Sequence, residues 1–235
     1  MATKLYLEST TTTLTPAAAD GGWTDTSQSS VYIAGTTKTG SALTNKNTTS
    51  AISTQADILI GQWLSHPLDA GQTITGSQTV NIVCLAAETA ANNNLILSWK
   101  VSVVNGTTTQ KTLIAKRNDA TEVATTNTSR TDSASSTAGN YTTVTGDRIQ
   151  IEIGLEGDPA GSNNHIGNIR VGSSSGSDLA YSDGVTTDNN PSVQLVTDTL
   201  TFNTVSASAS LSPSASLSPS ASSSLSKSPS ASLSP

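Results

Sequence analysis

Apolar and polar residues alternate along several short segments of the chain, and this period of two predicts β-strands. In residues 147–156 every second position is a branched aliphatic residue: Ile149, Ile151, Ile153 and Leu155. The positions between them are polar and are expected to face solvent: Arg148, Gln150, Glu152 and Glu156. This segment therefore predicts a strand with one buried face and one solvated face.

Other segments follow related patterns. Residues 95–104 alternate in the same way, whereas residues 79–87 are apolar on both faces, which predicts a strand in the centre of a sheet. Asn105-Gly106 lies between residues 95–104 and the alternating residues 110–116, and this dipeptide favours a hairpin, here with a loop longer than the tightest type. Further predicted strands cover residues 3–8, 31–34, 57–64, 111–116, 166–171, 192–196 and 200–205.

The number and spacing of these segments predict the fold class. About ten short strands separated by polar turns, with no sustained helical period, are typical of an all-β protein. We expect an antiparallel two-sheet sandwich of jelly-roll type. An immunoglobulin-like sandwich is the alternative, but its pair of cysteines is missing because Cys84 is the single cysteine.

Three stretches depart from the alternating pattern. Residues 35–55 and 120–140 are rich in Thr, Ser, Asn and Ala, and they are expected to form edge strands or exposed loops. Residues 206–235 contain only Ser, Ala, Leu, Pro and one Lys, with too few leucines to offset the entropy of ordering. The predicted organisation is a sandwich domain over residues 1–205, followed by a low-complexity tail or linker over residues 206–235.

Composition narrows the classes of function. The net charge of −6 and the scattered basic residues argue against nucleic-acid binding. No apolar run approaches the length of a membrane-spanning helix, and the first residues lack the apolar core of a secretory signal. We therefore expect a protein made in a cytoplasm that binds neither nucleic acid nor membrane.

Candidate catalytic and transition-metal residues are few. Residues 172–176 match the G-x-S-x-G pattern with Ser174 as nucleophile, but no helix is predicted after it and both histidines, His66 and His165, precede it. Neither histidine belongs to a metal-ligand spacing. Glu152 and Glu156 are four residues apart on one strand, about 13 Å, which is too far for paired carboxylates of a glycosidase. We expect no enzyme activity, no catalytic residue, no metal-binding residue and no cofactor.

Two weaker possibilities involve surface ligands. Asp178, Asp183 and Asp188 recur every five residues in a polar region, where oxygen-rich loops can hold Ca²⁺, although no twelve-residue calcium-loop signature is present. Of the aromatic residues, Trp63 and Trp99 are expected in the core and Trp23 at an end of the barrel or on the surface. Tyr141 and Tyr181 have polar neighbours and are expected to be exposed.

Several segments together resemble a known group of proteins. The segments are residues 3–7 (Thr-Lys-Leu-Tyr-Leu), a turn from Pro16 to Trp23, residues 59–68 (Leu-Ile-Gly-Gln-Trp-Leu-Ser-His-Pro-Leu), the strand at 80–85, and residues 145–154. They resemble uncharacterised virion proteins of tailed bacteriophages. The resemblance implies a sandwich domain that decorates a capsid or forms part of a tail or fibre, as a homo-oligomer such as a trimer, in contact with other virion proteins.

Three functions follow as hypotheses. The first is a non-enzymatic structural protein on the surface of a virus particle. The second is a carbohydrate-binding adhesion module for host surface glycans, which requires a shallow groove with exposed Tyr or Trp. The third is a subunit of an extracellular filament, in which residues 3–8 or the C-terminal extension complete the sheet of a neighbour.

Overall fold

The computed structural model describes residues 2–27, 29–38, 44–47, 56–89, 94–157, 166–173 and 176–203. All of them belong to one compact unit, Met1–Thr204. The predicted tail at residues 206–235 lies outside the described residues, as do His165 and Ser174. The described residues contain no helix, and therefore none that could span a membrane.

The described residues form thirteen strands. They are β1 (Thr3–Thr11), β2 (Ser30–Gly35), β3 (Thr44–Asn47), β4 (Ala56–Ser65), β5 (Thr73–Ile74), β6 (Thr79–Glu88), β7 (Leu95–Asn105), β8 (Thr108–Glu122), β9 (Thr128–Ser135), β10 (Tyr141–Thr142), β11 (Asp147–Gly157), β12 (Gly167–Val171) and β13 (Ser192–Leu195). This arrangement confirms the expected all-β class.

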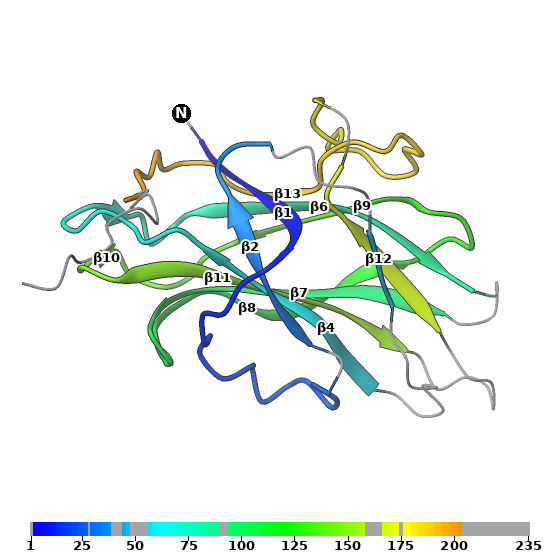
Figure 1. Cartoon of the computed structure of the whole chain (residues 1–235), viewed down its shortest axis with the longest axis horizontal. Helices are drawn as coiled ribbons and strands as arrows, with labels where there is room; N and C mark the ends of the chain where they lie inside the picture. The colour runs from blue at the N-terminus through cyan, green and yellow to red at the C-terminus, as the bar shows by residue number, and fades with distance from the viewer. Residues whose placement is uncertain are drawn as a thin grey trace, which may run out of the picture. The chain divides into compact units, whose positions relative to one another are not determined.

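Eleven strands form one curled sheet whose two halves stack on each other (Figure 1). One layer contains β4, β11, β7 and β8, and the other contains β9, β6, β12, β13 and β1. β1 and β2 join the layers, because β1 pairs with β13 on one side and with β2 on the other. The jelly-roll-like sandwich is therefore a single bent sheet, and its β2–β4 pair is parallel.

The core fills the space between the layers. Inward-facing residues of β7 and β11 meet those of β6, and all are fully or almost fully buried: Leu97, Trp99, Val101, Ile149, Ile151, Ile153, Val80, Ile82 and Cys84. β6 is central as predicted, with β9 on one side and with β12 and β13 on the other. Alternation along each strand thus supplies a continuous apolar interior.

Two predictions about individual elements need correction, and a third is confirmed. The β7–β8 hairpin has the tightest kind of loop, because Asn105 pairs with Thr108 and Gly106 adopts a φ of 54°. Residues 200–203 form no strand, only a single bridge between Phe202 and Leu68. Within 120–140, β9 is an eight-residue edge strand, which is one of the two alternatives predicted for this stretch, and its Arg130 and Ala134 are buried.

Candidate functional site

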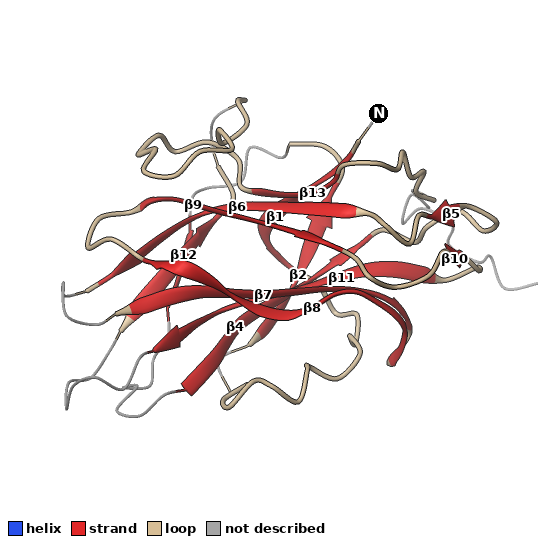
Figure 2. Ribbon diagram, turned by 180° about the vertical axis from the view of Figure 1, so that it is seen from behind, coloured by secondary structure: helices blue, strands red, loops and turns tan. Residues whose placement is uncertain are grey.

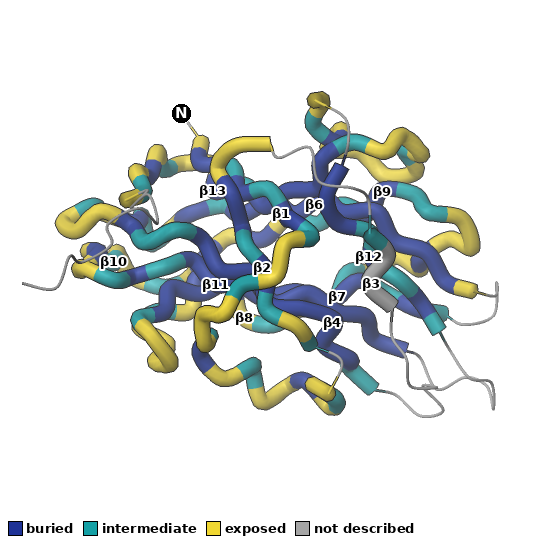
Figure 3. Tube along the Cα trace, in the orientation of Figure 1, coloured by how far each residue is buried: buried dark blue, intermediate teal, exposed yellow. Residues whose placement is uncertain are grey.

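The solvent-facing side predicted for residues 147–156 is in fact covered. The N-terminal strap, which we define as residues 12–27, crosses the outer face of β4 and β11 (Figure 3). The Ala17 backbone N–H donates to Gln150 at 3.0 Å, and the Ala17 carbonyl accepts from Gln62 at 3.2 Å. The residues expected in solvent are therefore buried, namely Gln150, Glu152 and Glu156.

Glu152 is the centre of this buried polar layer, with none of its surface exposed. Its carboxylate accepts hydrogen bonds from the Trp23 indole at 2.6 Å, the Asp20 backbone N–H at 3.1 Å and Gln150 at 3.0 Å. The Lys100 ammonium lies 3.7 Å from Glu152 and 3.1 Å from Asp20. These contacts compensate the cost of burying the charge and attach the strap to β7 and β11.

A second polar group continues from the first along β8. The Lys116 ammonium pairs with Asp57 at 2.8 Å and lies 4.9 Å from the centre of the Trp23 ring. Asn118 donates a hydrogen bond to Glu156, whereas Glu152 receives one from Gln150, so the two buried glutamates of β11 have different partners. Both groups hold strands and strap together, and this is a structural use of charge.

The two layers also meet along a seam between the edge strands β8 and β9, seen from behind in Figure 2. Among the described strands, β8 pairs with β7 alone and β9 with β6 alone, although the Ser129 backbone of β9 also bonds to Gly184 and Val185. Side chains connect the two edge strands instead: Asp132 pairs with Arg117 at 2.9 Å and accepts from the Trp99 indole at 2.7 Å, and Arg130 pairs with Asp119. Charged residues at these edges oppose pairing with other chains.

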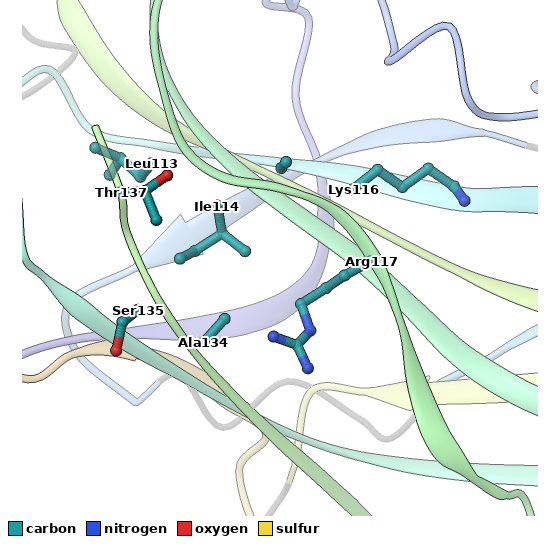
Figure 4. Close-up of a pocket in the computed structure, with 8 residues that line it drawn as sticks. Leu113, Ile114, Lys116, Arg117, Ala134, Ser135 and Thr137 are labelled. Carbon is teal, nitrogen blue, oxygen red and sulfur yellow. The ribbon is translucent and has the colours of Figure 1, made fainter.

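A hollow of about 220 Å³ lies at one end of the seam (Figure 4). Ile114 of β8 and Ala134 of β9 lie on opposite sides of it, and Ser135, Thr137 and Arg117 surround them. Leu113, Ile114 and Ala134, which line it, belong to the main core. The polar residues that line the hollow are Lys116, Arg117, Ser135 and Thr137, and no histidine or carboxylate lines it.

Two glutamates lie close together near the end of β6. Glu88 is buried, receives a hydrogen bond from the Leu95 backbone N–H and also bonds to Glu122. Burial first, and then the charge of Glu122, raise the pKa of Glu88 from an ordinary value of 4.5 to about 7. The folded protein therefore favours a protonated Glu88 in the pH range where the unfolded chain is ionised.

This shift predicts a pH dependence of stability. Because the folded pKa is raised, the contribution of Glu88 is complete below about pH 4.5 and is lost as the pH rises through 7. Glu88→Gln should therefore lose less stability than the wild type between pH 5 and pH 8, as measured by urea midpoints at both values. Equal losses in the two proteins would contradict the assignment.

The structure separates the three aspartates considered for calcium. Asp178 pairs with Lys4 and Lys38, Asp183 pairs with Arg130, and Asp188 pairs with Arg170. Within the described ranges no three His, Cys, Asp or Glu residues come together as metal ligands. Each aspartate instead fixes a different part of the segment that precedes β13.

The aromatic residues fall into two groups. Trp63 and Trp99 are completely buried, as predicted, and Trp23, which belongs to the strap, is 6% exposed because it lies against Glu152 of β11. Tyr141 is half-buried and donates a hydrogen bond to Asp147 at 2.7 Å, so its predicted exposure is only partial. Tyr181 is exposed as predicted, with half of its surface in solvent.

Comparisons with known proteins add little to this geometry. No protein-family model and no curated protein matches the chain. Among the matching solved structures is the structure of infectious bursal disease virus Gx strain, at 11% identity and a TM-score of 0.22. That match covers 66% of this chain and 41% of the other chain, so the chain spans less than half of that protein.

Proposed function

We propose that this protein is a non-enzymatic structural component of a virus particle, located on its surface as capsid decoration or as part of a tail or fibre. The observation that carries the proposal is the use of charged residues as internal ties. Glu152, Lys100, Lys116, Arg117 and Arg130 all connect strands or strap to the sandwich. In such a domain the charged side chains form ion pairs that hold the strands and strap together, and they do not form a reacting centre.

The segments that resemble phage virion proteins support the same proposal. Residues 59–68 contribute most of β4 and the turn after it, and residues 145–154 contribute most of β11. These adjacent strands form the face that the strap covers. The resemblance therefore concerns the scaffold of the domain, as expected for a protein whose function is architectural.

The filament hypothesis loses one of its two donors. Residues 3–8 belong to β1, which pairs on both sides within its own sheet and buries Leu5 and Leu7. This segment cannot join a neighbouring sheet without opening its own core. The other donor, the C-terminal extension, lies outside the described residues.

Purified particles test the proposal directly. Mass spectrometry of density-purified virions should detect this chain at a fixed stoichiometry to the major capsid protein, with host cytoplasmic proteins as the contamination control. Light scattering of the purified chain should give a mass that is a multiple of 23.9 kDa. Particles that lack the chain, or contain it only at the level of host contaminants, would refute the proposal.

A further inference from the structure

Tyr181 is the exposed aromatic residue of the described part of the chain. It lies in residues 176–190, a segment without regular strands that packs over the outer faces of β6, β9 and β13. Half of its surface is in solvent, whereas the tryptophans and Tyr32 are buried. An aromatic ring left in solvent by a domain with so few aromatics needs a physical explanation.

The segment is fixed to the sandwich before Tyr181. Asp178 pairs with Lys4 at 2.8 Å and Lys38 at 2.9 Å, and it accepts a hydrogen bond from Tyr6 at 3.0 Å. Burial raises the pKa of the Asp178 carboxyl, but these partners outweigh burial and lower the pKa to about 2. The carboxylate therefore remains charged and paired over the whole physiological pH range.

The segment is also fixed after Tyr181. Asp183 pairs with Arg130 at 3.0 Å and accepts from the Thr131 backbone N–H at 2.8 Å. The Tyr181 phenol itself bonds to Ser133 of β9. Because attachments lie on both sides, the ring is held in one place while its surface stays open, which lowers the entropic cost of binding a ligand.

A hollow of about 60 Å³ adjoins the ring. Val83 and Leu179 give it an apolar floor, and Asn81, Ser192 and Gln194 give it polar walls. Lys4 also lines it, with its ammonium paired to Asp178. The hollow thus combines a small apolar surface with side chains able to donate and accept hydrogen bonds, as ligand sites do.

The polar walls have unused hydrogen-bonding capacity. Among the described residues, neither the Ser192 hydroxyl nor the Gln194 amide has a hydrogen-bond partner, although Ser192 is only 3% exposed. The Asn81 carbonyl accepts from Ser133 at 2.8 Å, which leaves its amide nitrogen as a donor. Unpaired buried side-chain atoms also occur elsewhere in the described residues, such as the Ser102 hydroxyl and the Arg130 Nε, so it is the position of Ser192 and Gln194 beside an exposed ring that points to a ligand.

We propose that Tyr181 and the adjoining hollow form a binding site for a neutral sugar. An exposed ring offers a flat apolar surface to the C–H face of a pyranose, and amide and hydroxyl groups pair with its hydroxyls. The hollow is too small for a whole ring and accepts one substituent, such as a hydroxymethyl or acetamido group. A charged sugar is disfavoured because the nearby ions Asp178, Asp183, Lys4 and Arg130 already have partners.

Full-length protein tests this site against an array of neutral and acidic glycans, and by saturation-transfer NMR with methyl glycosides of glucose, galactose, mannose and N-acetylglucosamine. Wild type should bind at least one neutral sugar at millimolar concentration. Tyr181→Ala should weaken that binding about tenfold or more, and Tyr181→Phe should retain most of it. Gln194→Ala should weaken it less.

Val144→Ala is the matched control, because Val144 is an exposed apolar residue at 51% exposure in another part of the domain. It should bind like the wild type, and thermal melts should show that all four variants fold. Absence of neutral-sugar binding, equal binding by Tyr181→Ala, or binding of acidic glycans alone would overturn the site. None of these outcomes bears on the presence of the chain in virions, so the two proposals fail separately.

Discussion

Replacing Gly154 with alanine should destabilise the sandwich by about 3 kcal/mol or more. Gly154 lies at a register shift between β11 and β4. A Cβ atom at this position would be 2.0 Å from the Ile58 carbonyl oxygen and 2.6 Å from the Trp23 ring. The first contact is with backbone, so the clash can be relieved only by separating two central strands or by moving the strap.

Urea unfolding monitored by tryptophan fluorescence measures this effect. Gly139→Ala is the control, because a Cβ atom at Gly139 meets nothing within 4 Å, and its midpoint should match the wild type within error. A Gly154→Ala variant with an unchanged midpoint would show that β11 and β4 are not packed at this register.

Removing the ammonium of Lys100 is the second large perturbation. Lys100→Met keeps most of the length of the side chain but leaves Glu152 without its nearby cation, in a place with no solvent contact. Breaking one partner of a buried ion pair costs about 3–5 kcal/mol, because the remaining charge is uncompensated. The three hydrogen bonds that Glu152 receives place the expected loss at the lower end of this range.

The double variant Lys100→Met, Glu152→Gln separates charge from packing. Neutralising Glu152 should recover a substantial part of the lost stability. Lys111→Met is the control, because Lys111 has no ion pair among the described residues, and it should change stability little. If the single Lys100→Met variant were as stable as the wild type, the polar layer under the strap would not be a stabilising element.

The alternation of apolar and polar residues identifies which residues share a face of a strand, and this information is sufficient to predict the all-β fold class. Residues 79–87, 95–104 and 147–156 are the centres of β6, β7 and β11, and their apolar positions form the core. Alternation carries no information on whether a polar face is covered, so the sequence pattern alone places Glu152 in solvent. The covering strap has no regular pattern, and only its contacts in the structure, with Gln62, Gln150 and Glu152, reveal its position.

The candidate sugar site was only partly accessible from sequence. The polar surroundings of Tyr181 correctly predicted an exposed ring. The hollow beside it is built from β1, β6 and β13, whose residues are far apart in the chain and meet only through strand pairing. Likewise β9 lacked a recognisable apolar stripe, because Arg130 and Asp132 occupy inward positions and form ion pairs across the seam.

The pairing of β1 has a consequence for folding. Thr3 lies opposite Leu195, so the N-terminal strand of the sandwich needs a neighbour that is synthesised about 190 residues later, near the end of the described domain. Until that neighbour is synthesised, β1 can pair only with β2, and the junction between the layers stays incomplete. Contacts so distant in sequence slow folding, and the core can therefore close only after translation of the domain is essentially finished.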